Sequence, residues 1–332
     1  MQSNEQLIDL LNQATAISGT EIGEALGISR AAVNKRIQLL VENGLPIKAA
    51  SGKGYQLENG VTLLSENAIK SALQTPLIES VDVWQAIGST NSHLLQQGIL
   101  GGRAKLCVTE SQSDGRGRRG NDWQSSPYRN IMLSLSWGFD HWPETITGLG
   151  LAVSLVIAEY LNGFVLPVST DSSATEKVRI KWPNDLMVNG EKLGGILIDV
   201  AGESSGACNV VIGIGINVHQ PDWSDGGAYR WQDLHGLGVS VNRNKVVADL
   251  SSALAVMLDE FGRTGFAPLA DRWNALSSYA QRQIKVGNRN DFIHGVMQGV
   301  DSVGALLLQD HNGKIQRFTD SNVSVRLIDS GS

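Results

Sequence analysis

One run of glycines and arginines in this 332-residue chain has the residue types needed to hold an anion. It reads GRGRRG at residues 115–120 and lies between two predicted strands, 104–109 and 130–137. Glycines let backbone N–H groups come close to an anion, and each arginine offers a rigid fork of donors to carboxylate or phosphate. The pattern predicts a mobile loop that grips phosphate, with an RG-type nucleic-acid segment or a plain linker as the alternatives. It is not a Walker loop, because no Gly-Lys-Ser/Thr follows.

Three charged residues are expected to meet on neighbouring strands. The stretch 178–199 begins with alternating apolar and basic residues, turns at a Pro-Asn-Asp sequence, and turns again at an Asn-Gly pair, the strongest short hairpin signal. This folding brings Lys181, Asp185 and Lys192 within reach of one another. Two ammonium groups and one carboxylate suit an anionic ligand with a divalent cation. Taken alone, the segment also fits surface charges on sheet edges.

Two other segments have residues that suit a ligand. Ser89, Thr90 and Asn91 follow a predicted strand and open a helix, so they are either helix caps or hydrogen-bond partners for a polar ring. The predicted strand 210–218 carries glycine at its outward positions, which leaves room for a flat ligand against the backbone. It is not a dinucleotide site, because the third glycine is missing and no helix follows. The polar stretch 219–229 predicts a second mobile loop.

The first 60 residues predict a DNA-binding head. The stretch 19–37 reads as helix, tight turn and helix, with Ala25 at the helix crossing, Gly27 in the turn and Ser29 as N-cap. Residues 46–57 then read as a two-stranded wing with a basic, glycine-rich tip.

Local charge supports this interpretation, although the whole chain has a net charge of −6. The second helix and the wing carry five basic residues against the single acid Glu42, as phosphate contact requires. A protein-interaction module with a solvated basic face is the alternative. The residues expected to contact DNA are Thr20, Ser29, Arg30, Ala31, Asn34, Lys35, Arg36 and Lys53.

The overall composition narrows the class of protein. A hydrophobic content of 42% and a charged content of 18% fit a globular chain. The N-terminus lacks the basic start and apolar run of an export signal, and the best apolar stretch, 149–161, is too short to cross a bilayer. Cys107 and Cys208 make neither a disulfide framework nor a zinc site. These features predict a cytoplasmic protein without membrane contact.

The C-terminal part predicts helices followed by short strands. Apolar residues fall on one face of the stretch 244–261, and a second helix holds Leu269, Trp273 and Leu276. From residue 282 onward, five short strands separated by turns predict a small β-barrel.

Together these motifs resemble those of the bifunctional biotin–protein ligase and biotin operon repressor family. The similarity covers essentially the whole chain and includes GISRAAVNKRIQLL, GKGYQL, GSTN, GRGRRG, KWPNDL, KLGGIL, GIGIN and GVDSVGALLL. The resemblance implies an α/β (α+β) fold in three domains. These are a winged helix-turn-helix at 1–62, a central mixed sheet with helices similar to class II aminoacyl-tRNA synthetases at 63–278, and a small SH3-like β-barrel at 279–332.

The resemblance also implies an activity. Such ligases join biotin to ATP, giving biotinyl-5′-AMP and pyrophosphate, with Mg²⁺ and without a tightly bound prosthetic group. They then transfer biotin to a lysine of a biotin carboxyl carrier protein, typically that of acetyl-CoA carboxylase. The adenylate-bound form becomes a homodimer and represses the biotin genes at their operator DNA.

Site residues follow from the resemblance position by position. Biotin would be bound by Ser89, Thr90, Asn91, Gln112, Arg116, Gly117, Arg118 and Lys192. ATP would be bound by Arg118, Arg119, Lys181, Asn184, Asp185, Asn217 and, by loose alignment with an adenine-stacking residue, Trp231. Asp185 would lie near Mg²⁺. The catalytic residues would be Lys192, Arg118 and Lys181, which offset the repulsion between a carboxylate and a phosphate as they react.

The chain departs from the family pattern in two places. Asn121 and Asp122 stand where many relatives have a basic residue, and the polar stretch 169–176 reads as a surface insertion without a role. A lipoate ligase, a sensor that binds biotin without turnover, and a ligase whose head no longer binds DNA are the alternatives. GRGRRG with KWPND favours biotin, and the presence of both Lys181 and Lys192 argues against a sensor.

Overall fold

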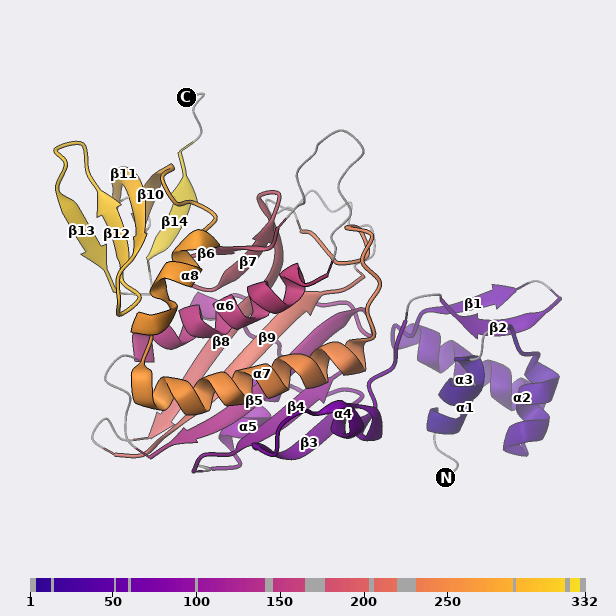
Figure 1. Ribbon diagram of the computed structural model, residues 1–332. Coiled ribbons are helices and arrows are strands. Elements are labelled where there is room, and N and C mark those ends of the chain that lie inside the picture. The colour runs from indigo at the N-terminus through magenta and orange to yellow at the C-terminus, as the bar shows by residue number, and fades with distance from the viewer. Residues whose placement is uncertain are drawn as a thin grey trace.

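The computed structural model describes residues 4–328, apart from 13–14, 51, 59–60, 99–100, 141–145, 165–176, 203–205, 220–230, 289–290 and 320–322. Most of the predicted loop at 219–229 and all of the stretch 169–176 lie outside the described residues. Three units follow one another along the chain: a helical head with a wing, a large sheet covered by helices, and a small C-terminal sheet (Figure 1).

The head has the expected winged helix-turn-helix layout. Its elements are α1 (Asn4–Leu11), α2 (Gly19–Leu26), α3 (Arg30–Glu42), β1 (Ile47–Ala50) and β2 (Gly54–Leu57). The two strands pair antiparallel and form the wing. Apolar side chains from all three helices make a small core of their own.

The turn between α2 and α3 confirms two predictions and corrects a third. Gly27 has φ 64°, a conformation that favours glycine, and Ser29 caps α3 with its hydroxyl. The helix crossing predicted at Ala25 is wrong, because Ala25 is exposed. Gly23 makes the close approach instead, since a Cβ there would lie 2.7 Å from the carbonyl oxygen of Ile28.

The central unit is a seven-stranded mixed sheet in the order β3-β4-β5-β9-β8-β7-β6. β3 pairs with β4 in parallel, and the other neighbours pair antiparallel. The strands are β3 (Ile78–Trp84), β4 (Ala104–Thr109), β5 (Asn130–Phe139), β6 (Arg179–Lys181), β7 (Asp185–Val188), β8 (Glu191–Gly202) and β9 (Cys208–Asn217). The long helices α6 (Leu149–Asn162) and α7 (Arg243–Thr264) run across one face (Figure 1), and the short α5 (Thr90–Leu95) contacts the sheet through the opposite face. A further helix, α4 (Glu66–Ala72), packs beside α7.

Strand β9 shows how the two faces of this sheet differ. Ile212, Ile214 and Ile216 are buried in the main apolar core. Gly213 and Gly215 point the other way, because successive side chains on a strand alternate. The predicted outward glycines are therefore confirmed, and the face opposite α6 and α7 is bare along β9.

The C-terminal unit follows a short helix, α8 (Ala270–Ala275), which is shorter than the predicted second helix because a 3₁₀ turn, Ala267–Leu269, precedes it. The expected barrel strands form a five-stranded antiparallel sheet in the order β13-β12-β11-β10-β14. They are β10 (Gln283–Asn288), β11 (Asp291–Val300), β12 (Leu306–Gln309), β13 (Ile315–Phe318) and β14 (Ser324–Leu327). The boundaries at 62 and 278 stay predictions.

A buried ion pair joins the head to the central unit. Arg243 opens α7 and meets Glu110, the residue after β4, at 2.7 Å, and their side chains are only 2% and 5% exposed. Arg243 also donates to the carbonyl oxygens of Thr62 and Asn130, and Glu110 accepts the N–H of Leu64 at 2.7 Å. The link between the units is thus fixed by charged groups that water does not reach.

The stretch just before β5 packs against the head. Tyr128 is buried in the apolar core of the head, and a Cβ at Gly44 would lie 3.0 Å from the ring of Pro127. Arg129 pairs with Glu58, which follows the wing, at 2.6 Å. The arginine loop therefore starts and ends at residues that hold the head in place.

Candidate functional site

The bare face of the central sheet brings most of the predicted site residues together. The strand register places Ser134, Gly213 and Leu197 in one row across β5, β9 and β8. Gly215 and Gly195 lie in the next row, two residues further along, at about 7 Å. These rows form the floor of a region, called the slot below, that the arginine loop borders.

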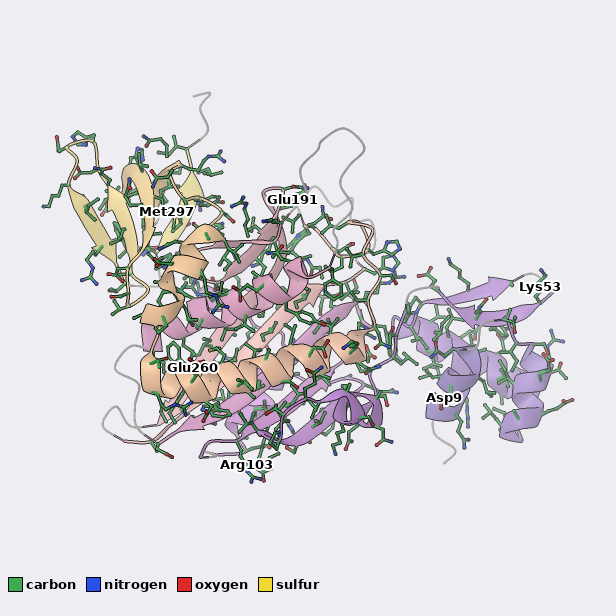
Figure 2. The ribbon with its side chains drawn as sticks, in the orientation of Figure 1. Asp9, Lys53, Arg103, Glu191, Glu260 and Met297 are labelled. Atoms are coloured by element: carbon green, nitrogen blue, oxygen red, sulfur yellow. The ribbon has the colours of Figure 1, made fainter. Side chains whose placement is uncertain are left out.

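The charged end of the slot lies at the turn between β7 and β8. Glu191, the first residue of β8, marks this turn in Figure 2. The ammonium of Lys192 pairs with Asp185 at 2.7 Å, and both side chains are about a quarter exposed. Lys181 lies opposite Asp185 in the strand register. The expected meeting of three charges on neighbouring strands is confirmed as geometry.

Burial lowers the pKa of Lys181 below its ordinary value. The positive charges of Lys192 and Arg326 act in the same direction, and the carboxylate of Asp185 acts against them. An anion arriving here would relieve the repulsion between cations, so this end of the slot favours a phosphate or carboxylate.

An aromatic pair beside these charges was missed at the sequence level. The indole of Trp123 lies on Gly215 and Gly195, so closely that a Cβ at Gly215 would overlap it. Trp231 meets Trp123 edge to face at 6.5 Å, and Lys192 lies 5.7 and 5.9 Å from the two rings. The only sequence signal was an aromatic residue directly after the arginine loop. The structure thus places Trp231, which aligned only loosely, at the site.

The polar end of the slot lies around the start of α5. Gln112 accepts from both the backbone N–H and the hydroxyl of Thr90, at 2.8 and 3.1 Å. Ser134, which was not predicted, donates to the amide oxygen of Asn91 at 2.5 Å. Ser89 caps α5 with its hydroxyl. The cap alternative therefore holds for Ser89, while Thr90 and Asn91 belong to a polar cluster.

The arginine loop spreads its three guanidinium groups unequally. Arg118 donates to Asn184 at 2.8 Å, next to the charged end. Arg116 pairs with Asp199 on β8 at 2.8 Å. Arg119 is exposed and has φ 61°. Two of the three arginines thus lie against the slot in this structure, and the contacts predicted for Arg119 and for Gly117 stay predictions.

Asn217 has a structural explanation. It is 1% exposed, and its amide donates to the carbonyl oxygens of Lys192 and Gln232 at 3.4 and 3.1 Å while accepting from Asn130 at 3.1 Å. These bonds hold the two chain segments that carry Lys192 and Trp231. A direct contact with ATP stays a prediction for this residue.

The DNA-contact residues gather on one side of the head, with one exception. Those that are exposed are Thr20, Ser29, Arg30, Ala31, Asn34, Lys35 and Lys53. Lys53 stands at the tip of the wing in Figure 2. Arg36 is half-buried, and its Nη1 has no hydrogen-bond partner, so this arginine fits a phosphate contact least well.

Two searches of the described residues found nothing. No group of three or more His, Cys, Asp or Glu side chains among them could hold a metal ion. No described helix has the length and apolarity needed to span a membrane.

Comparison with known proteins bears on both ends of the chain. Residues 87–217 match the Biotin/lipoate A/B protein ligase family, and residues 4–56 match an HTH domain. The chain is 36% identical to the bifunctional ligase/repressor BirA of Salmonella typhimurium over 324 residues, which are 96% of each chain. It is also 36% identical to BirA of Escherichia coli over 322 residues, 97% of this chain and 96% of that one.

A solved structure supports the fold. The biotin protein ligase from Aquifex aeolicus, in complex with biotin and ATP, superposes with a TM-score of 0.62 at 21% identity. The match covers 76% of this chain and all of that one.

Proposed function

Because the chain belongs to the family of bifunctional biotin ligase/repressors, we propose that it activates biotin with ATP and passes it to a protein lysine. In the first step, a carboxylate oxygen of biotin attacks the α-phosphate of ATP, the bond to pyrophosphate breaks, and biotinyl-5′-AMP forms. In the second step, the lysine amine attacks the carbonyl carbon, AMP leaves, and the nitrogen loses a proton as the amide forms.

The observation that carries this proposal is the arrangement of the slot. A polar cluster at Thr90 and Gln112 suits the ureido ring of biotin, and the ammonium of Lys192 lies near the next floor row, about 7 Å away. Lys192 and Lys181 would offset the negative charge of the carboxylate and the α-phosphate, which grows as they react. No protein nucleophile is required, because the substrate carboxylate is the nucleophile.

Magnesium fits this site only together with ATP. Mg²⁺ commonly takes one or two carboxylates and completes its shell with phosphate oxygens and water. Asp185 is a carboxylate at the charged end, and its pairing with Lys192 at 2.7 Å shows that it can face a cation there. We assign Asp185 to Mg²⁺, whose charge would neutralise the phosphates. The side chains of Lys192 and Asn184 would orient the phosphates around it.

The head gives the second part of the function. Its exposed basic helix and wing suit the phosphates of DNA. We infer that biotinyl-5′-AMP is the corepressor, that the adenylate-bound chain forms a homodimer on the operator of biotin genes, and that the acceptor lysine belongs to a biotin carboxyl carrier protein. Such an enzyme would work in the cytoplasm, where ATP and carrier are available.

Two assays test this proposal. Pyrophosphate release and labelling of a carrier domain should depend on biotin and ATP, and lipoate should not replace biotin. Release that depended on lipoate but not biotin would overturn the choice of substrate. In a mobility-shift assay, operator DNA should be retarded when biotin and ATP are both present. Retardation by a chain lacking residues 1–62 would show that the head is wrongly assigned.

A further inference from the structure

A single carboxylate ties the arginine loop to the floor of the slot. Asp199 lies on β8, on the same face as Leu197 and Gly195, because side chains on a strand alternate. Its Oδ2 accepts from Arg116 at 2.8 Å and from the side chain of Asn91 at 3.0 Å. The side chains of Asp199 and Arg116 are 24% and 40% exposed, so the pair is partly shielded from water.

The same carboxylate fixes the orientation of the Asn91 amide. The nitrogen of this amide donates to Asp199, and its oxygen accepts from Ser134. Room for it exists because residue 213 is glycine: a Cβ at Gly213 would overlap the amide. Asp199 therefore connects the arginine loop to the polar end of the slot.

The arginine loop depends on few such ties because its backbone closes on itself. Trp123 donates its N–H to the carbonyl oxygen of Gly115 at 2.9 Å, so the residues between them form one compact turn. Arg116 fastens this turn to β8 and Arg118 fastens it to Asn184. Loss of the Arg116 contact would free the turn at the polar end while the Arg118 contact still held the charged end.

We propose that Asp199 is a positioning residue that holds the arginine loop over the biotin end of the slot and slows the escape of biotin and its adenylate; this rests on the proposed ligase function. Gly195, whose Cβ position lies 3.3 Å from the Lys192 ammonium, is four residues away along β8, or about 13 Å. Over that distance Asp199 has little effect on the reacting atoms. It acts on retention of the ligand and leaves the chemical step almost unchanged.

The first experiment measures retention in Asp199→Ala, Arg116→Ala and the double variant. Adenylate release, followed by chase with unlabelled biotin, should be about three- to tenfold faster in each single variant, with a similar rise in the biotin KM. The single-turnover adenylation rate at saturating biotin should stay within about twofold of wild type. The double variant should match Asp199→Ala, because both changes break one contact. Additive losses, or unchanged release, would overturn the proposal.

The second experiment needs no catalysis. Trypsin should cut the arginine loop of the ligand-free chain faster in Asp199→Ala, and in the milder Asp199→Asn, than in wild type. The matched control is Asp259→Ala, which breaks an exposed 2.9 Å pair with Arg263 on α7 and should leave loop cleavage unchanged. Equal cleavage in all four proteins would refute the tie. Faster cleavage in a chain that makes no adenylate would retain the tie and refute the ligase function.

Discussion

The buried pair between Glu110 and Arg243 gives a prediction whose size follows from the structure. Glu110→Gln leaves the Arg243 guanidinium, 2% exposed, without its counter-charge, so the free energy of unfolding should fall by about 3–5 kcal/mol. This is a large share of the roughly 5–15 kcal/mol that stabilises a typical domain. Replacing both partners, in Glu110→Leu with Arg243→Met, removes both charges together and should cost less than Glu110→Gln alone.

Urea unfolding followed by tryptophan fluorescence measures this difference. All eight tryptophans lie between residues 84 and 273, so the signal reports the central unit rather than the head. The control is Asp259→Ala in the exposed pair with Arg263, which should cost less than about 1 kcal/mol. A Glu110→Gln loss as small as the control, or a double variant less stable than either single variant, would refute this account of the joint.

Three further predictions concern other parts of the molecule. Gly215→Ala pushes a Cβ into the loop tryptophan and should raise the KM for ATP several-fold in steady-state assays, whereas Gly206→Ala, where nothing lies within 4 Å, should not. Burial, with help from the adjacent His235, lowers the pKa of His219 below 6.5, so protonation favours the unfolded chain. Unfolding free energy should therefore fall as pH drops below about 6.5, and His219→Gln should flatten that pH profile in urea titrations. Lys53→Ala should weaken operator binding and reduce the slope of log affinity against log salt by about one in mobility-shift titrations.

Local patterns predicted the elements that carry the site. Alternation placed glycines on the open face of β9, and the Asn-Gly turn set the register that brings Lys192 to Asp185. Both outcomes depend on residues close together in the sequence, and neighbouring strands then fix their spacing.

Contacts between distant segments were not predictable in the same way. The ion pair of Glu110 and Arg243 joins residues 133 positions apart, and no local pattern marks either partner. Trp123 could be placed on Gly215 only after the path of the arginine loop over the sheet was known. The mistake at Ala25 has a similar cause, because the closest approach of two backbones depends on their crossing angle.

Mass spectrometry of the chain after incubation with ATP, Mg²⁺ and biotin tests the central claim most directly. Wild type should carry a bound mass equal to biotinyl-5′-AMP. Lys192→Ala should form the adenylate roughly 30- to 800-fold more slowly, because removing one charged donor from such a site costs about 2–4 kcal/mol. A wild-type spectrum without the mixed anhydride, or equal rates in the two proteins, would contradict the assignment of this slot to biotin activation.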